Sequence, residues 1–284
     1  MTSTPNTHPQ HVLVVGGGTG KTGRRVAERL ERLGIDVRIG SRSARPSFDW
    51  NDPSTWAAAV DGIDAAYLSY YPDVSFPDAA AAVGAFARQA AAAGVRRLVL
   101  LSGRGEPEAE PAERSVQEAG VEWTVLRCAW FTQNFSEHFL LQPVLDGVIA
   151  LPAGDITEPF LDVDDVADVA VAALTEGGHH GQVYELTGPR LLGFADIAAE
   201  LSRATGRRID YVSVTPEQYA AAAAAAGVPA EEIEPLTELF TRVLDGHNAY
   251  LTSDVQKVLG RPARDFADYG RRTAASGAWQ PTGH

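Results

Sequence analysis

The 284-residue sequence predicts an α/β fold: a doubly wound parallel sheet with a smaller, mostly helical C-terminal lobe. From residue 11 onward, short runs of β-branched residues alternate with segments whose apolar residues recur at helical spacing. Parallel strands require crossover connections, which are nearly always helical and right-handed, so helices should cover both faces of the sheet. We predict a disordered tail at residues 1–10, a sheet domain at 11–150, and a mixed region at 151–284 that completes the sheet and forms the lobe.

The first predicted elements form a βαβ unit. An apolar run at residues 11–15 leads into a glycine-rich turn, and a helix follows in which apolar residues such as Val26 and Leu30 recur at helical spacing. Val37 and Ile39 then alternate along a second strand. This unit predicts two parallel strands joined by a helix.

Asp52 and Pro53 are typical of an N-cap and a first helical residue, so a helix should begin there and end near Gly62. The alternation then continues along the chain. Strands are expected at 63–71, 95–103, 121–127 and 181–189. Helices are expected at 78–93, 111–119, within 160–176, at 194–207, and at 217–246 with a break at 227–229.

Composition and charge exclude several classes of protein. The net charge of −13 argues against binding to nucleic acid or to an anionic membrane, because both would repel the chain. Cys128 is the single cysteine, which excludes an internal disulfide and a zinc site built on several thiolates. Residues 1–10 lack the features of a secretory signal, and no apolar run approaches the length of a membrane span. A cytoplasmic protein is expected.

Gly17, Gly20 and Gly23 follow the first predicted strand and open the first helix. This spacing is typical of a dinucleotide-binding turn, because residues without a Cβ let backbone N–H groups approach a pyrophosphate, whose charge the helix N-terminus attracts. The domain is therefore predicted to be of the Rossmann type. Glycines that serve only tight helix–strand packing are the alternative. A nucleoside triphosphatase loop is less favoured, because it would need a glycine at Val15.

The end of the second strand favours NADPH over NADH. An NAD-specific site carries an acidic residue about twenty residues beyond the glycines, where it binds the ribose 2′-hydroxyl. This sequence has Ser41 and Arg42 instead, and a guanidinium matches a 2′-phosphate. Arginines that are only solvated loop charges are the alternative. Asp49 and Trp50, placed after a third strand, are expected to flank the adenine, with a packed core tryptophan as the other interpretation.

Three segments carry a resemblance to a known family. They are the GGTGKTG turn with SRSARPSFDW after it, the strand VRRLVLLSG, and the segment VEWTVLRCAWFTQNF. Together they resemble the NmrA-like branch of atypical short-chain dehydrogenase/reductases over nearly the whole chain. Within that branch, the first segment resembles the ergot-alkaloid reductases of the festuclavine synthase and agroclavine dehydrogenase group, which reduce an iminium carbon with NADPH.

The resemblance implies roles for individual residues. Arg42 is implied to lie at the ribose phosphate, and both Ser102 and residues 131–134 near the nicotinamide. Ser69 and Gly103, at strand ends, complete the predicted cofactor site. The residues implied to bind the phosphates are Gly17, Thr19, Gly20, Lys21 and Thr22.

The sequence lacks the Tyr-x-x-x-Lys pair that donates a proton in typical short-chain dehydrogenases. Its only lysines are Lys21 and Lys257, and neither has a tyrosine four residues before it. Reduction of an iminium neutralises a cation, and a quinone accepts hydride without a strong acid, so either substrate suits a site without that pair. The candidate catalytic residues are Ser102, Tyr70 and Tyr71.

Ligands of open α/β sheets bind beyond the carboxyl ends of the strands. Tyr70 and Tyr71 can donate a proton or stack on substrate, and packing at the rim is an equal alternative for each. The substrate-pocket residues selected by this rule are Tyr70, Tyr71, Arg104, Trp130, Phe131 and Asn134.

Other polar residues are assigned structural roles. His138 falls in a predicted helix among aromatic residues and is expected at its surface or in packing. Asp162, Asp164 and Asp165 precede a helix, where capping is favoured over metal binding or acid–base chemistry. The pair His179–His180 has no matching acid or thiol cluster, so no metal site is predicted.

These observations predict an NADPH-dependent reductase of a small electrophilic molecule such as an imine, iminium or quinone, acting without metal as a monomer or homodimer. The alternative is an NmrA-like regulator that senses NADP(H) and binds a protein partner without turnover. Fold-level analogy does not decide between the two.

Overall fold

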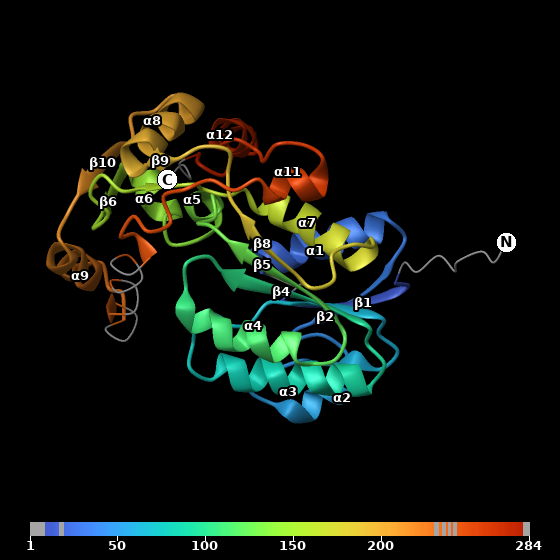
Figure 1. Cartoon of the computed structure of the whole chain (residues 1–284). Coiled ribbons are helices and arrows are strands. Elements are labelled where there is room, and N and C mark those ends of the chain that lie inside the picture. The colour runs from blue at the N-terminus through green and yellow to red at the C-terminus, as the bar shows by residue number, and fades with distance from the viewer. Residues whose placement is uncertain are drawn as a thin grey trace. The chain divides into compact units, whose positions relative to one another are not determined.

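The computed structural model describes residues 9–16, 20–229, 233, 234, 237, 240 and 243–280 (Figure 1). The predicted tail at 1–10 therefore lies almost wholly outside the described residues. The chain forms two compact units, and each is built from several stretches of sequence. The first unit comprises Met1–Cys128, Val163–Leu186 and Asp254–Arg261. The second comprises Ala129–Asp162, Thr187–Ser253 and Pro262–His284.

The division between the units differs from the predicted boundary at residue 150. Residues 129–150 belong to the second unit, whereas 163–186 and 254–261 return to the first. The chain passes between the units several times, so a single cut in the sequence cannot separate them. A strand within 163–186 joins the sheet of the first unit.

The first unit is built on a parallel sheet of six strands, in the order β2-β1-β3-β4-β5-β8, within the described residues. The direction of strand addition reverses between β1 and β3, which is the mark of a doubly wound sheet and confirms the predicted fold class. The strands are β1 (His11–Val15), β2 (Asp36–Gly40), β3 (Ala65–Leu68), β4 (Arg97–Gly103), β5 (Glu122–Cys128) and β8 (Gln182–Leu186).

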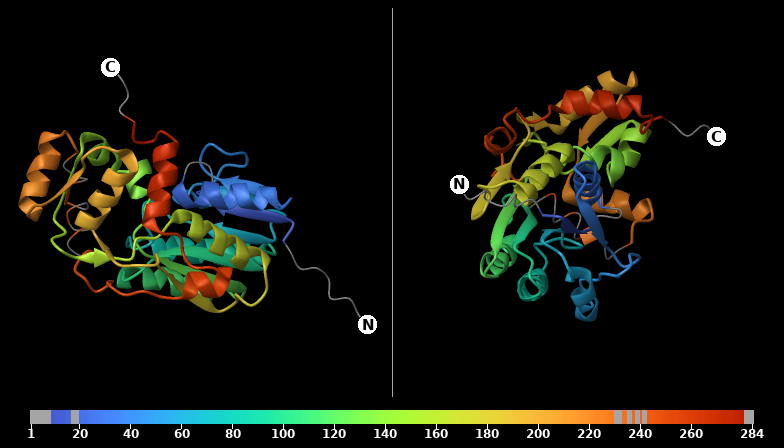
Figure 2. Two further views of the ribbon diagram at one scale, coloured as in Figure 1. Left: turned by 90° about the horizontal axis from the view of Figure 1, so that it is seen from above. Right: turned by 90° about the vertical axis from the view of Figure 1, so that its right-hand side faces the viewer.

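Helices cover both faces of this sheet (Figure 1). On one face, α1 (Lys21–Arg32) packs beside α7 (Val163–Thr175), and the view from above in Figure 2 shows the pair over the sheet. The other face carries α2 (Trp56–Val60), α3 (Ala79–Ala92) and α4 (Glu110–Gln117). The remaining helices of the unit are α11 (Asp254–Leu259) and the 3₁₀ turns η1 (Pro53–Thr55) and η2 (Pro107–Ala109).

The predicted helix start at Asp52 is confirmed. The Asp52 carboxylate accepts a hydrogen bond from the Ser54 N–H at 3.1 Å, and Pro53 is the first residue of the 3₁₀ turn that leads into α2. Gly62 follows the helix at a φ of +71°, as expected for a helix end.

The predicted third strand before Asp49 is wrong. Residues 47–50 form a loop whose only pairing is an isolated bridge between Asp49 and Asp52, and the third strand in the structure is β3. Trp50 is 8% exposed and packs edge-on against Phe48 and Phe86. Burial of these rings holds the loop in place, so tertiary packing replaces the hydrogen-bond ladder that the sequence pattern predicted.

The second unit mixes helices with two short strand pairs. Parallel strands β6 (Val148–Leu151) and β10 (Asp210–Ser213) form one pair, and antiparallel β7 (Thr157–Glu158) and β9 (Leu192–Gly193) form the other. Buried phenylalanines, including Phe135, fill its core. Within the described residues, the helices of this unit with defined bounds are α5 (Asn134–Glu137), α6 (Leu141–Asp146), α8 (Phe194–Thr205), α9 (Pro216–Ala225) and α12 (Phe266–Ala275).

The predicted helix from residue 217 is confirmed as α9, and Gly227 breaks it at a φ of +83°. Most of the predicted continuation at 230–242 lies outside the described residues. Among the residues that the structure describes, no helix combines the length and apolar character of a membrane span.

Candidate cofactor-binding site

A hydrogen bond joins the two ends of the glycine turn between β1 and α1. Gly16 has a φ of +76° and donates its N–H to the Gly40 carbonyl at 3.0 Å. Gly20 donates its N–H to the Gly16 carbonyl at 3.1 Å, and a Cβ on Gly20 would lie only 2.5 Å from that oxygen. Only glycine fits there. The predicted phosphate contacts Gly17 and Thr19 lie outside the described residues.

The start of α1 fits an anionic ligand. Gly20 is the N-cap and supplies no side-chain cap, and the first turn contains no acidic residue. Lys21 begins the helix, and Thr22 is buried beside it. The backbone N–H groups, the helix dipole and the lysine charge all favour a negatively charged group such as a pyrophosphate.

Arg42 lies in the loop after β2, the strand that pairs with β1 in the sheet. Its guanidinium is exposed and makes no hydrogen bond or ion pair with any residue that the structure describes. Ser41 is half-buried, and its hydroxyl lies 3.3 Å from that of Ser43. Arg42 and Ser41 therefore fit a 2′-phosphate, because the Arg42 guanidinium has no competing partner among the described residues.

Ser69 lies against the glycine turn, and Asp49 lies in the loop at residues 47–50. A Cβ on Gly16 would lie 3.4 Å from the Ser69 Cβ, so Ser69 lies directly against the turn. The Ser69 carbonyl accepts a hydrogen bond from Trp50 Nε1 at 3.0 Å. Asp49 uses its carboxylate to accept the Asn51 N–H at 3.0 Å, which shapes the loop. The role of Asp49 beside an adenine stays a prediction.

The two tyrosines after β3 have different environments. The Tyr70 ring packs on Trp50 with ring centroids 5.2 Å apart, whereas Tyr71 is 76% exposed. Burial raises the pKa of the Tyr70 phenol, and the Asp78 carboxylate adds to this effect. Tyr70 is therefore partly covered by protein and Tyr71 is exposed, and a contact of either residue with substrate stays a prediction.

Ser102 belongs to a buried polar network that the sequence did not predict. Its hydroxyl donates to Glu113 Oε1 at 2.6 Å, and Arg127 Nη2 donates to Glu113 Oε2 at 2.6 Å. Ser102 and Arg127 lie opposite each other on β4 and β5. The bond to Glu113 raises the pKa of Arg127 above its ordinary value. One signal was visible: Glu113 shares helical spacing with apolar Val116, which indicates a buried face.

Gly103 and Arg104 continue the chain beyond Ser102. A Cβ on Gly103 would lie 2.3 Å from the Glu106 carboxylate, so the Glu106 side chain covers this glycine. Arg104 is 2% exposed, and its Nε lies 3.3 Å from Glu185 Oε2. The predicted pocket residue Arg104 is therefore a buried member of an ion pair, and its contact with substrate stays a prediction.

The other predicted pocket residues belong to the second unit. The Trp130 ring stacks on Phe240 with centroids 5.9 Å apart, and Phe131 forms a bridge with Leu161. Asn134 begins α5 and is largely buried. Ser102, Tyr70, Tyr71 and Arg104 belong to the first unit, and a pocket shared by all these residues stays a prediction.

His138, for which packing was expected, lies edge-on to Phe139 with ring centroids 5.0 Å apart. His179 Nδ1 lies 2.9 Å from the Tyr184 hydroxyl, and burial lowers the pKa of His179. His180 Nδ1 accepts the Trp123 N–H at 3.2 Å. Both residues of the His179–His180 pair thus have partners within the protein.

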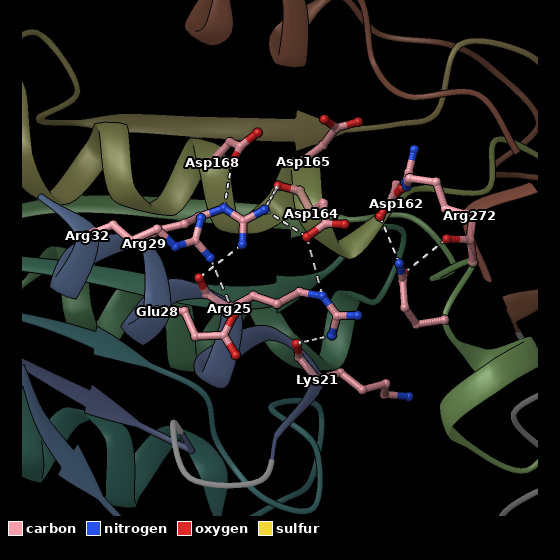
Figure 3. Close-up of polar contacts among 12 residues, drawn as sticks. Lys21, Arg25, Glu28, Arg29, Arg32, Asp162, Asp164, Asp165, Asp168 and Arg272 are labelled. Atoms are coloured by element: carbon pink, nitrogen blue, oxygen red, sulfur yellow. Dashed lines mark hydrogen bonds and ion pairs between the residues drawn. The ribbon is translucent and has the colours of Figure 1, made fainter. Parts of the chain in front are cut away.

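The acidic residues at the start of α7 face arginines (Figure 3). Asp164 lies 2.7 Å from Arg29 Nη2 and 3.4 Å from Arg25 Nε. Asp165 lies 2.8 Å from Arg261. Ion pairing was not predicted for these aspartates and accounts for their clustering.

Asp162 has its own partners within the second unit. Its carboxylate lies 2.6 Å from Arg272 Nη2 and accepts a hydrogen bond from Gln133 Nε2 at 2.8 Å. Across the described part of the chain, no three His, Cys, Asp or Glu side chains form a group that could hold a metal ion.

A doubly wound sheet, a glycine turn after its first strand and an uncapped helix start together define a dinucleotide-binding protein of the Rossmann type. A family model described as NAD(P)H-binding matches residues 17–177, and the chain belongs to this family.

Similar proteins agree with this assignment. The chain is 32% identical to the NAD(P)H azoreductase of Xenophilus azovorans, with 93% of this chain and 99% of that protein covered. It is 33% identical to agroclavine dehydrogenase of Claviceps fusiformis, with 90% and 95% covered. The crystal structure of NmrA, a negative transcriptional regulator in complex with NAD, matches with a TM-score of 0.70 at 17% identity and covers 96% and 97%. The predicted resemblance is confirmed, and the chain is an NAD(P)H-dependent oxidoreductase.

Proposed function

We propose that this protein is an NADPH-dependent reductase that delivers hydride to a small electrophilic acceptor, such as an imine, an iminium or a quinone. Its membership of the NAD(P)H-binding family and its similarity to two redox enzymes support the reductase activity. The preference for NADPH over NADH is carried by one observation: Arg42, exposed after β2, has no partner in the described chain. The finer choice of acceptor follows from the chain's own acid–base groups.

The cofactor fits the residues present. Gly20 lets the backbone approach a phosphate, Lys21 adds positive charge, and Thr22 is placed at the same helix start. Arg42 and Ser41 would bind the 2′-phosphate, and Ser102 lies at the carboxyl end of β4. When bound, NADPH would supply the hydride.

Neither lysine of the chain can act as the lysine of a Tyr-x-x-x-Lys pair. Lys21 begins α1, and Lys257 lies on α11, where its ammonium group is 2.7 Å from Asp254. An acceptor that needs a strong acid to stabilise an alkoxide is therefore disfavoured. An iminium accepts one hydride and becomes a neutral amine. A quinone accepts one hydride and takes its proton from water.

The substrate class and the cellular location follow from charge and from the single cysteine. A small organic molecule is the expected substrate, and binding to nucleic acid is disfavoured by the net charge of −13. The single cysteine, Cys128, is buried, and burial raises the pKa of its thiol, which suits a cytoplasmic protein whose cysteine takes no part in the chemistry.

The test is calorimetric titration with NADPH and NADH, followed by NADPH oxidation at 340 nm with cyclic imines and quinones. Preferential binding of NADPH with turnover of an imine or quinone supports the proposal. Tight binding without turnover of any acceptor would favour a regulator that senses NADP(H). Failure to bind either nucleotide would overturn the proposal altogether.

A further inference from the structure

Ser102 and Glu113 form the buried part of a polar network on one side of the sheet, and Arg127, whose side chain is 27% exposed, completes it. Ser102 is 4% exposed and Glu113 is 2% exposed. Glu113 Oε1 accepts hydrogen bonds from the Ser102 hydroxyl at 2.6 Å and from Arg127 Nε at 2.9 Å. Glu113 Oε2 accepts a third bond from Arg127 Nη2 at 2.6 Å. Arg127 Nε also lies 3.1 Å from Glu113 Oε2, so both carboxylate oxygens are held by donors, which fixes the geometry of the carboxylate.

The direction of the Ser102 hydrogen bond follows from its partner. A carboxylate paired with a guanidinium can only accept, so the Ser102 hydroxyl must give its proton to Glu113. A hydroxyl has one proton and two lone pairs. Once the proton is committed, Ser102 can only accept hydrogen bonds from any further group that reaches it.

The position of Ser102 in the sheet indicates which ligand group could reach it. The glycine turn follows β1, and Arg42, the predicted 2′-phosphate residue, follows β2 on one side of β1. A dinucleotide whose pyrophosphate lies at the turn must extend its other half to the opposite side, over the ends of β3 and β4. Ser102 is the next-to-last residue of β4. The nicotinamide carboxamide carries an NH₂ donor, which an oxygen restricted to accepting can bind.

We propose that Glu113 is a positioning residue that holds the Ser102 hydroxyl as a hydrogen-bond acceptor for the carboxamide NH₂ of NADPH. Ser102 then helps to orient the nicotinamide and does not donate a proton to the substrate. This inference rests on the cofactor binding in the proposed function. It also explains why the buried Glu113, paired with Arg127, lies directly behind a serine at a strand end.

The test uses two forms of the cofactor that differ only at this group. NADP⁺ has the carboxamide, whereas its 3-acetylpyridine analogue has a methyl group in place of the NH₂ and cannot donate. A third probe, 2′,5′-ADP, lacks the nicotinamide half. The wild-type protein should bind NADP⁺ about tenfold more tightly than the analogue, which corresponds to one hydrogen bond. All three affinities are measured by calorimetry, so turnover is not required.

Two variants and a matched control complete the experiment. Ser102→Ala and Glu113→Gln should each reduce the preference for NADP⁺ over the analogue to less than about twofold, because each removes the oriented acceptor. The double variant should show no further loss. Glu110→Gln is the control, since Glu110 is on the same helix, is half-exposed, and lies 3.8 Å from Arg127 without contacting Ser102. It should keep the wild-type ratio.

The outcomes separate this inference from the proposed function. An unchanged ratio in a folded Glu113→Gln or Ser102→Ala protein would overturn the inference. It would not contradict the proposed reductase function. If Glu113→Gln does not fold, Ser102→Ala alone decides. Absence of 2′,5′-ADP binding in the wild-type protein would instead overturn both. A loss of affinity for all three ligands in the variants would indicate a merely structural role and count against the inference.

Discussion

Arg29 of α1 donates a hydrogen bond to Asp168 of α7 at 2.6 Å and so joins the helix after the glycine turn to its neighbour on the same face of the sheet (Figure 3). The same guanidinium contacts Asp164 at 2.7 Å. The side chains are mostly buried, at 16% exposure for Arg29 and 25% for Asp168. Arg29 thus links α1 to α7 through two carboxylates, which have Arg25 and Arg261 as their further partners.

Replacing Arg29 with methionine should lower the free energy of unfolding by about 1–3 kcal/mol, since Asp164 and Asp168 both lose a partly buried partner. Urea denaturation measures the change. Arg32→Met is the control, because Arg32 and Glu28 are exposed and 3.5 Å apart, and it should cost less than about 1 kcal/mol. Equal effects of the two substitutions would show that the α1–α7 pairing contributes nothing specific.

Arg42→Ala should weaken NADPH binding by about tenfold or more and leave NADH binding nearly unchanged, because only NADPH carries the 2′-phosphate. Calorimetric titration of both nucleotides gives the two ratios. Arg45→Ala serves as a matched control, since Arg45 is exposed in the same loop and donates to the Ala44 carbonyl. Equal losses for NADPH and NADH would remove Arg42 from the 2′-phosphate site.

Gly20→Ala should distort the glycine turn, because its Cβ would approach the Gly16 carbonyl oxygen to 2.5 Å. We expect destabilisation of about 1–3 kcal/mol and loss of most nucleotide affinity. Thermal unfolding with and without NADPH measures both effects. Gly177→Ala is the control, since its Cβ would meet nothing within 4 Å. A fully stable Gly20→Ala protein that binds NADPH normally would show that the turn tolerates a side chain.

Tyr70→Phe and Tyr71→Phe should each change the turnover of an iminium substrate by less than about threefold, whereas removal of a true general acid costs about 10²- to 10⁴-fold. The reason is that hydride addition to an iminium requires no proton. Steady-state kinetics with a cyclic imine measures kcat, and calorimetry measures NADPH affinity. A collapse of kcat with unchanged NADPH affinity would refute a mechanism without a proton donor at these tyrosines.

Stability should fall as the pH drops below about 6.5, in part through His179. Burial lowers the pKa of His179 from its ordinary value of 6.5, and the Arg97 charge opposes its protonation further while Glu176 favours it. The unfolded chain then binds more protons than the folded one in this range, so the free energy of unfolding rises with pH. Denaturant melts between pH 5 and 8 should show a shallower slope for His179→Gln. An identical slope would exclude His179 as a contributor.

Much of the fold follows from local patterns. The glycine turn, the strands of the sheet and the cap at Asp52 were predictable because backbone conformation, side-chain periodicity and capping depend on residues close in sequence. The strand expected before Asp49 was predicted wrongly, because a local pattern does not show packing against distant residues. Its residues look like a strand, but packing of Phe48 and Trp50 against Phe86, far along the chain, holds them in a loop.

The residues of the candidate site also differ in whether the sequence alone predicts them. Arg42 and the glycine turn were predicted from the sequence, because both were chosen by their distance from the first strand. Glu113 and Arg127 were not, because their contact with Ser102 depends on the register of β4 against β5 and on the packing of α4 above them.

By itself, the sequence determined the succession of strands and helices, the position of the glycine turn, and the absence of a Tyr-x-x-x-Lys pair. Only the tertiary structure decided that Ser102 gives its proton to Glu113, that the aspartates of α7 pair with arginines, and that the chain returns repeatedly to the first unit. The physical reason is one of range. Periodicity and capping act within a few residues, whereas a buried charge finds its partner only when strand register and helix packing bring distant segments together.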